Sequence, residues 1–199
     1  MQHASLIQAA TQTLIDHVGE LTALDQAIGD GDHGLNMRRG AVAIQARLDD
    51  LSVQSLKEAL KTMGLACMST VGGSSGPVFG TLLMALGKEL PEQPNAADLA
   101  RALDAGINAL TRLGKAEVGQ KTLLDVLDPV RRLLADAADL PRDELLVRVR
   151  DCANQSAQAT AQMAAQRGRS SFLGERALGH VDPGSRSMAL IIGSICDAL

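Results

Sequence analysis

The spacing of apolar residues predicts helices along almost the whole chain. Apolar side chains recur every three or four residues, and no segment shows the alternation of a half-buried strand. This spacing marks eight segments, at residues 6–18, 37–48, 56–67, 78–83, 99–110, 123–134, 145–163 and 187–199. The sequence therefore predicts an all-α bundle of about eight helices.

The composition limits how the interior of this bundle can be built. Hydrophobic residues make up 46% of the chain, but Trp and Tyr are absent and Phe occurs only at positions 79 and 172. We expect a core of Leu, Ala, Ile, Val and Met, in which the abundant Leu and Ala favour helix. Because no linker, repeat or low-complexity tract interrupts the 199 residues, we expect residues 1–199 to form one domain.

Several classes of function are disfavoured by the same sequence. The net charge is −4 and no cluster of Lys and Arg appears, which argues against nucleic-acid binding. Cys67, Cys152 and Cys196 lie far apart, without zinc-binding or disulfide spacing. The N-terminus lacks the pattern of a signal peptide, and no apolar run reaches the length of a membrane span. We therefore expect a soluble cytoplasmic protein that binds neither nucleic acid nor membrane.

Three aspartates in one short glycine-rich stretch are the strongest functional signal. Asp25, Asp30 and Asp32 lie within eight residues, and Gly29, Gly31 and Gly34 let this stretch fold tightly. A pair of carboxylates about 4 Å apart costs roughly 4 kcal/mol at an effective dielectric of about 20. A hard divalent cation such as Mg²⁺, shared with substrate phosphates, would relieve that repulsion. The structural alternative makes Asp32 a helix N-cap and Asp30 part of an Asx-turn.

Familiar phosphate and calcium motifs fail on their context. Residues 29–34 match GxGxxG and residues 114–122 resemble a Walker A loop, but neither follows a predicted strand. An EF-hand that begins at Asp30 would place Ala41 where the bidentate Glu is needed. We therefore reject a dinucleotide fingerprint, a P-loop and an EF-hand.

Two further loops and one histidine have residues suited to anions. Residues 72–77, GGSSGP, precede a predicted helix and could present backbone N–H groups to a phosphate, although an ordinary turn between helices fits equally well. Arg169 could contact a phosphate, and residues 182–184, DPG, ordinarily form a surface turn. His33 suits a phosphate contact or proton transfer, and a capping or solvated histidine fits as well.

Four separated motifs resemble the L-subunit family of dihydroxyacetone kinases. They are GDGDHGLNM, STVGGSSGPVFGT, GKAEVGQKTLLDVLDP and GRSSFLGERALGHVDPGS, and the resemblance covers essentially the whole chain in the same order. It implies a single-domain eight-helix antiparallel barrel-like bundle with a nucleotide site at one end. Gln120 and Leu123 depart from the family, which usually has Asp and Met at these positions.

The resemblance also implies which residues bind. Asp25, Asp30 and Asp32 would hold two Mg²⁺ ions beside ADP or ATP. The phosphates would lie along residues 33–36 and along the turn that contains Ser74 and Ser75. The adenine and the remaining contacts would lie beyond them. The nucleotide contacts implied in this way are His33, Gly34, Leu35, Asn36, Ser74, Ser75, Gly114, Leu123, Arg169, Asp182, Pro183 and Gly184. No catalytic side chain is implied, because phosphoryl transfer depends chiefly on positioning and charge neutralisation.

The implied activity is that of a phosphotransferase subunit. In the phosphoenolpyruvate-dependent systems, a phosphohistidine on an M subunit rephosphorylates bound ADP, and the ATP then phosphorylates dihydroxyacetone held on a K subunit. At 199 residues, we expect the chain to lack a K-like domain and to act with separate K and M partners. The alternatives are a subunit of an ATP-dependent small-ketose kinase and a nucleotide-state sensor that binds a transcription regulator.

Overall fold

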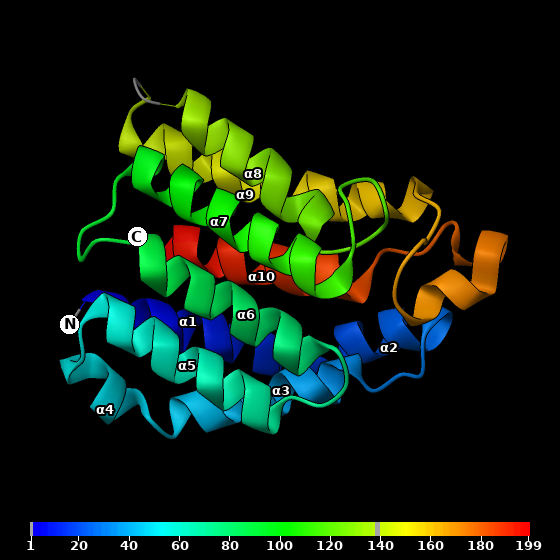
Figure 1. Ribbon diagram of the computed structural model, residues 1–199, viewed down its shortest axis with the longest axis horizontal. Helices are drawn as coiled ribbons and strands as arrows, with labels where there is room; N and C mark the ends of the chain where they lie inside the picture. The colour runs from blue at the N-terminus through cyan, green and yellow to red at the C-terminus, as the bar shows by residue number, and fades with distance from the viewer. Residues whose placement is uncertain (1, 138–139) are drawn as a thin grey trace.

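Helices make up the regular structure of the described residues. The computed structural model describes residues 2–137 and 140–199. Within this part of the chain it contains ten α-helices and two 3₁₀ helices and no strand (Figure 1). The elements are α1 (Gln2–Asp16), α2 (Val18–Ile28), α3 (His33–Gln45), α4 (Leu48–Val53), α5 (Leu56–Thr70), α6 (Ser75–Glu89), α7 (Ala96–Gly114), α8 (Leu124–Asp136), α9 (Arg142–Ala159), η1 (Thr160–Gln162), η2 (Arg169–Ala177) and α10 (Pro183–Ala198).

Eight of the α-helices close into a barrel. The contacts between elements run in a ring through α1, α3, α5, α6, α7, α8, α9 and α10, and α10 packs back on α1. Neighbours in this ring run in opposite directions (Figure 1). The predicted all-α, eight-helix antiparallel barrel is therefore confirmed.

Two short helices, α2 and α4, lie outside the ring and were not among the eight segments predicted from spacing. The α4 segment, LDDLSV, buries only Leu51, so it has no apolar stripe that spacing could reveal. The chain passes from α1 to α2 at His17, whose backbone leaves the helical region (φ −99°, ψ 15°). The α2 helix buries Leu21, Asp25 and Ile28. Because Asp25 lies between Leu21 and Ile28, the apolar stripe of α2 is interrupted in the sequence.

Local capping explains where several ring helices begin. Ser55 and Glu58 form a reciprocal capping box at the start of α5, and Asn95 and Asp98 form another at the start of α7. Asp182 caps α10 by accepting the Ser185 N–H, and Pro183 follows as the first helical residue. These polar starts are local signals and do not depend on the core.

The interior of the barrel is aliphatic, as the composition predicted. Leu21, Leu51, Val126, Leu127 and Ala153 are at most 1% exposed and belong to one continuous core, in which Phe79 is the only aromatic residue among those described. Within the described chain, no helix combines the length and the apolar character that a membrane crossing requires.

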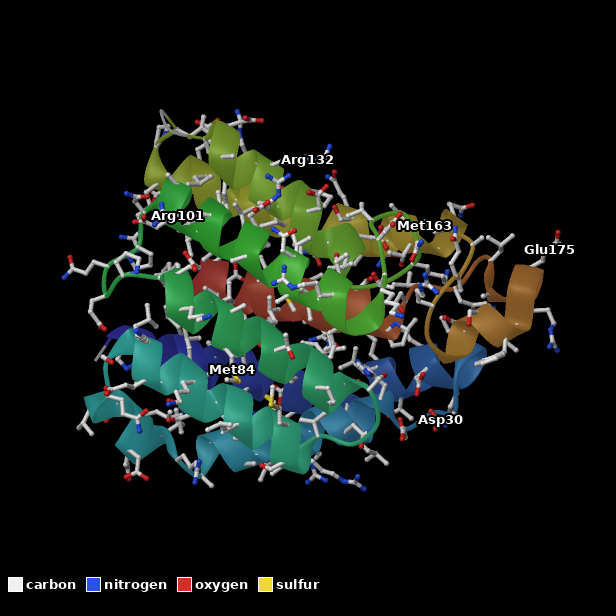
Figure 2. The ribbon with its side chains drawn as sticks, in the orientation of Figure 1. Asp30, Met84, Arg101, Arg132, Met163 and Glu175 are labelled. Carbon is white, nitrogen blue, oxygen red and sulfur yellow. The ribbon has the colours of Figure 1, made fainter. Side chains whose placement is uncertain are left out.

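The two ends of the barrel differ in what they carry. The chain termini lie at one end, and the turns before α3, α6, α8 and α10 lie at the other (Figure 1). Asp30 and Glu175 project at this second end, whereas Arg101 lies near the first (Figure 2). The loops singled out by the sequence therefore meet at one end of the barrel.

Candidate functional site

Three carboxylates gather at the turn between α2 and α3. Asp25 lies in the last turn of α2, Asp30 in the connecting turn, and Asp32 directly before α3. One carboxylate oxygen of each lies within 4.8 Å of the other two. Because such a cluster of oxygen donors repels itself unless a cation neutralises it, its chemistry fits a hard divalent ion such as Mg²⁺.

The buried member of this triad also builds the start of α3. The Asp25 carboxylate accepts the His33 backbone N–H at 3.0 Å. Asp32 occupies the N-cap position of α3, as the structural alternative predicted, but its side chain makes no capping hydrogen bond. A Cβ at Gly29 would lie 2.1 Å from an Asp25 oxygen. Glycine at this position therefore lets the turn close over the carboxylate.

Four helices of the barrel point their N-termini toward the triad's end. These are α3, α6, α8 and α10. Ser74 precedes α6 without capping it through its side chain, and Pro77 falls in the first turn of that helix. Free backbone N–H groups and the helix dipole make a helix N-terminus a site for anions. The triad therefore faces a surface suited to phosphate groups.

The His33 ring is engaged on both sides by protein hydroxyl groups. Its Nδ1 lies 3.2 Å from Ser75 Oγ, and its Nε2 lies 2.8 Å from Ser187 Oγ. Since the Ser187 hydroxyl donates to the Pro183 carbonyl at 3.0 Å, these partners assign the proton to Nε2 and make Nδ1 the acceptor of the Ser75 hydroxyl. Burial lowers the pKa of His33, against the opposing effect of Asp25 and Asp32. The neutral ring thus joins α3, α6 and α10.

The triad and the start of α3 form one wall of the site, and the loop between α7 and α8 forms a second. The Asp125 carboxylate is 3% exposed and accepts the backbone N–H groups of Gly119 and of Thr122, the latter at 2.7 Å. These bonds hold the loop so that Ala116 and Leu123 are buried beside Leu110. This end of the site is apolar, in contrast to the acidic triad.

A third wall runs from the end of α9 to the start of α10. Thr160 is fully buried, and its hydroxyl accepts the Asp182 backbone N–H at 3.0 Å. The Asp182 carboxylate in turn accepts the Ser185 N–H at 2.6 Å. Arg167 and Ser170 face the site from the intervening segment.

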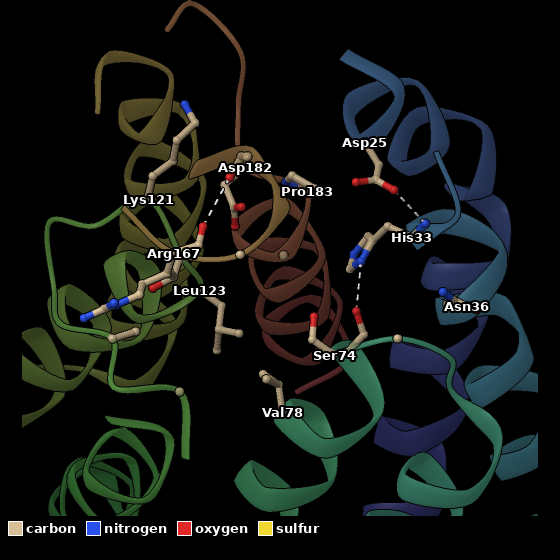
Figure 3. A pocket seen from close by; sticks show the side chains of 18 of the residues that line it. Asp25, His33, Asn36, Ser74, Val78, Lys121, Leu123, Arg167, Asp182 and Pro183 are labelled. Carbon is tan, nitrogen blue, oxygen red and sulfur yellow. Dashed lines mark hydrogen bonds between the residues drawn. The ribbon is translucent and has the colours of Figure 1, made fainter. Parts of the chain in front are cut away.

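The three walls enclose a cavity of about 270 Å³ (Figure 3). Most of the residues predicted from the sequence line it. They are Asp25, Asp30, Asp32, His33, Asn36, Ser74, Ser75, Gly114, Leu123, Asp182, Pro183 and Gly184. Residues from distant parts of the chain therefore meet in one site, and their roles in binding stay predictions.

Three predicted residues are not placed along the cavity. Gly34 packs against α2, where a Cβ would lie 2.4 Å from the Val18 carbonyl oxygen. Leu35 is 47% exposed and does not line the cavity. The side chain of Arg169 lies outside the described residues. Within the described chain, Arg167 is the arginine that lines the cavity, and the sequence did not single it out.

Other lining residues also escaped sequence reasoning. Lys121 and Thr122 lie in the segment that was rejected as a P-loop, although the unusual run GKAEVGQKT was itself a signal. Six further ones are apolar residues with ordinary helical spacing: Ile28, Val78, Phe79, Leu110, Ala116 and Leu124. Spacing cannot distinguish an apolar residue beside a cavity from one in the core.

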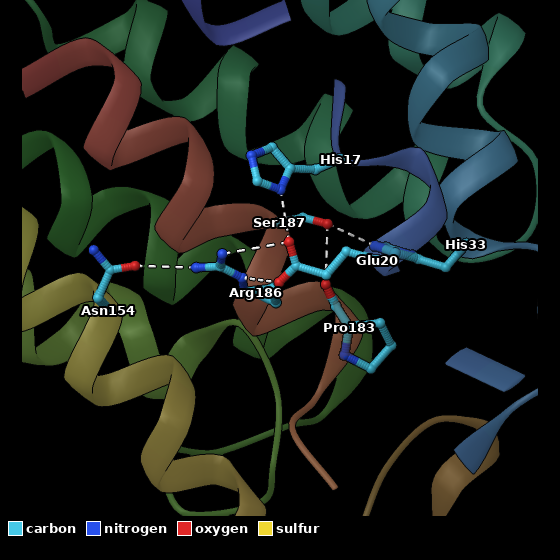
Figure 4. A network of polar contacts seen from close by, with 7 residues as sticks. All are labelled: His17, Glu20, His33, Asn154, Pro183, Arg186 and Ser187. Atoms are coloured by element: carbon cyan, nitrogen blue, oxygen red, sulfur yellow. Dashed lines mark hydrogen bonds and ion pairs between the residues drawn. The ribbon is translucent and has the colours of Figure 1, made fainter. Parts of the chain in front are cut away.

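A polar network fixes α10 against its neighbours behind the site (Figure 4). Arg186 Nε contacts the Glu20 carboxylate at 2.5 Å, and Arg186 Nη1 donates to Asn154 Oδ1 at 3.1 Å. His17 Nδ1 lies 2.6 Å from Glu20. Burial alone would raise the pKa of Glu20, but the hydrogen bonds with Arg186 and His17 outweigh it and hold that pKa below its ordinary value. The network ties α2 and α9 to α10 one turn beyond Pro183.

The raised pKa of the Asp182 carboxyl predicts that the stability of the protein depends on pH. Burial raises its pKa from 3.8 to about 6, against the lowering by hydrogen bonds from Ser185 and by the charge of Lys121. Because the folded state binds this proton more tightly than the unfolded state does, protonation of Asp182 stabilises the fold. This stabilisation is complete below pH 3.8 and is lost as the pH rises through about 6. Asp182→Asn keeps an acceptor for the Ser185 N–H but does not titrate.

We therefore expect wild type to lose stability relative to Asp182→Asn as the pH rises. The difference in free energy of unfolding should shift by up to about 3 kcal/mol between roughly pH 4 and pH 7. Urea unfolding of both proteins without nucleotide or metal, at several pH values, measures it. A difference independent of pH would contradict the raised pKa.

Comparison with known proteins places this site in a family. The model of the DAK2 domain matches residues 27–197. The chain is 37% identical over 174 residues to the ADP-binding subunit of PEP-dependent dihydroxyacetone kinase 1 of Listeria innocua, which covers 86% of this chain and 82% of that protein. It is also 37% identical to the ADP-binding subunit of the PEP-dependent dihydroxyacetone kinase of Escherichia coli, over 86% of this chain and 84% of that one.

A solved structure shares the fold. The dihydroxyacetone kinase of C. freundii, in complex with AMP-PNP and Mg²⁺, matches 98% of this chain with a TM-score of 0.78 and 27% identity. The match covers 33% of that longer chain. The fold and the site thus define a helical barrel that gathers acidic side chains and helix N-termini at one end (Figure 1). The chain belongs to the DAK2 domain family.

Proposed function

We propose that this protein is the nucleotide-binding subunit of a phosphoenolpyruvate-dependent dihydroxyacetone kinase, a phosphotransferase. The observation that carries the proposal is one cavity in which Asp25, Asp30 and Asp32 face the N-termini of barrel helices. Support comes from the ADP-binding subunits of Listeria innocua and Escherichia coli, each of which is 37% identical to this chain.

The cavity suggests which of its residues contact each part of the nucleotide. The triad would hold Mg²⁺, which neutralises phosphate charge; two ions are proposed from the family resemblance. The starts of α6, at Ser75, and of α10, at Gly184, would face the phosphates with backbone N–H groups. The apolar end around Leu110 and Leu123 would take the base. ADP would thus lie across the mouth of the barrel.

The residues that line the cavity position phosphates more readily than they attack them. The His33 ring is held between two serine hydroxyls, and the Ser75 hydroxyl donates to that ring. Phosphoryl transfer needs alignment and charge neutralisation more than a protein nucleophile. We therefore propose that bound ADP acts as a coenzyme. It would be rephosphorylated by the phosphohistidine of an M subunit, and the resulting ATP would phosphorylate dihydroxyacetone on a K subunit.

Reconstitution tests this function. We expect the purified protein to retain ADP and two Mg²⁺ ions in native mass spectrometry. With K and M subunits, we expect it to support phosphoenolpyruvate-driven phosphorylation of dihydroxyacetone with ADP in catalytic amounts. Each subunit omitted in turn is the control. Turnover of free ATP at full rate without the M subunit would contradict the coenzyme role. Contact with a transcription regulator, a cytoplasmic location and a single domain over residues 1–199 stay predictions.

A further inference from the structure

One buried lysine closes the base of a loop that faces the cavity. The pocket loop, residues 161–179, leaves the bundle after Thr160 and returns at His180. Lys121 Nζ donates to the carbonyl oxygens of both Thr160 and His180, each at 2.6 Å. Beside it, the Gly179 N–H donates to the Ala161 carbonyl at 2.8 Å. The two ends of the loop therefore meet at a single ammonium group.

The position of Lys121 is costly unless these contacts compensate. The residue is 1% exposed, and its backbone has φ +61°, a region that residues other than glycine seldom adopt. A buried ammonium requires hydrogen-bond partners, and the two carbonyls supply them. Burial lowers the pKa of Lys121, and the nearby charge of Asp182 opposes that effect. Lys121 thus combines a buried ammonium group with an uncommon backbone conformation.

Lys121 joins two walls of the cavity that are remote in sequence. Its neighbours Thr122 and Leu123 line one wall, while Arg167 and Ser170 of the pocket loop line another. Figure 3 shows the Lys121 side chain extending away from Ser74 and Val78. Its ammonium thus fixes backbone carbonyls and points away from the start of α6 (Figure 3).

We propose that Lys121 is a positioning residue that locks the neck of the pocket loop and so holds Arg167 and Ser170 against the bound nucleotide. This inference rests on the proposed function, because it concerns the same cavity. The lysine acts through the loop and makes no contact with the phosphates. Without the ammonium, the carbonyls of Thr160 and His180 lose their shared donor and the loop populates open states.

Lys121→Met tests this role, with Lys88→Met as the matched control. Lys88 is exposed near the end of α6, far from the cavity. Hydrogen exchange of the full chain should rise in residues 161–179 of Lys121→Met and stay unchanged in the barrel helices. If the closed loop falls to about a tenth of the population, Mg-ADP affinity in calorimetry falls about tenfold. Lys88→Met should match wild type in both measurements.

The outcomes separate positioning from the alternatives. Weaker ADP binding with unchanged exchange in the loop would mean a direct contact and overturn the proposal. A lower melting temperature with unchanged ADP affinity would mean a purely structural role and overturn it as well. If wild type and Lys88→Met also fail to bind Mg-ADP, the proposed function fails, while the exchange result still decides whether Lys121 locks the loop.

Lysine labelling of the wild-type chain provides a test that needs no variant to fold. Under brief acetylation with an N-hydroxysuccinimide ester, Lys121 should react at least about tenfold more slowly than Lys88, because reaction requires local opening. Mg-ADP should slow Lys121 further and leave Lys88 unchanged. Equal rates at the two lysines, or no effect of Mg-ADP on Lys121, would overturn the proposal.

Discussion

An Asp30→Asn variant is expected to lose magnesium-dependent ADP binding while its helices remain intact. The substitution removes one of three charges whose oxygens lie within 4.8 Å of one another. Even partners beyond the direct ligands of a metal commonly contribute about 10- to 100-fold to affinity, so a ligand itself should cost at least about 100-fold. Calorimetric titration with ADP, with and without Mg²⁺, measures this loss, and circular dichroism checks the fold.

Asp30 is a better position for this test than Asp25. Asp25 is buried and accepts the His33 backbone N–H, so its replacement would disturb α3 as well as the metal site. Asp50→Asn on exposed α4, at the opposite end of the barrel, is the matched control and should bind ADP as wild type does. Unchanged ADP affinity in Asp30→Asn would refute the assignment of the triad to metal.

Gly34→Ala is expected to have the second large effect, through packing. A Cβ at this position would lie 2.4 Å from the Val18 carbonyl oxygen and 2.8 Å from the Thr22 backbone N. Backbone atoms of α2 cannot rotate away, so α3 must shift. Overpacking of this kind costs about 1–3 kcal/mol of stability. Since α2 carries Asp25 and α3 follows Asp32, the shift should also separate the triad and abolish tight Mg-ADP binding.

Gly19→Ala on the same helix pair is the control for this prediction. A Cβ at Gly19 meets no atom within 4 Å. Alanine at a helical position favours the helix, by at most about 1 kcal/mol over glycine. Chemical denaturation should therefore find Gly19→Ala at least as stable as wild type and Gly34→Ala less stable. Equal stability of Gly34→Ala and wild type would show that α3 moves without cost.

The sequence predicted a bundle of helices because these helices carry apolar stripes, whereas the antiparallel barrel was implied by the resemblance to the family. Spacing alone located all eight helices of the ring, and the near absence of aromatic residues matched an aliphatic core. It did not reveal α4, which buries one leucine, or the break at His17. Short helices stabilised by their place in the fold leave little periodic signal.

The sequence predicted those parts of the candidate site whose polar side chains lie close together along the chain. Asp25, Asp30 and Asp32 lie close in sequence, and the structure brings them together. Lys121 and the two hydroxyls around His33 were not assigned these contacts, because their partners lie 39 to 154 residues away. No local pattern indicates that a lysine will bind the carbonyl groups of a later loop. Such tertiary contacts require the folded chain.

The topology itself explains why one end of this barrel suits phosphates. An up-and-down ring places every second helix start at the same end, and here these are the starts of α3, α6, α8 and α10. Aligned helix dipoles favour negative charge there. The acidic triad would repel an anion at the same place unless a cation lay between them. A divalent cation held by Asp25, Asp30 and Asp32 would reconcile the two features, because it would neutralise the charge of the phosphates.

The most direct test of this account is a crystal structure of the protein with ADP and Mn²⁺, recorded at the manganese absorption edge. We predict anomalous density between the carboxylates of Asp25, Asp30 and Asp32 and the ADP phosphates, with the adenine beside Leu110 and Leu123. Ordered ADP elsewhere, or a triad that holds no manganese while ADP is bound, would contradict the central claim.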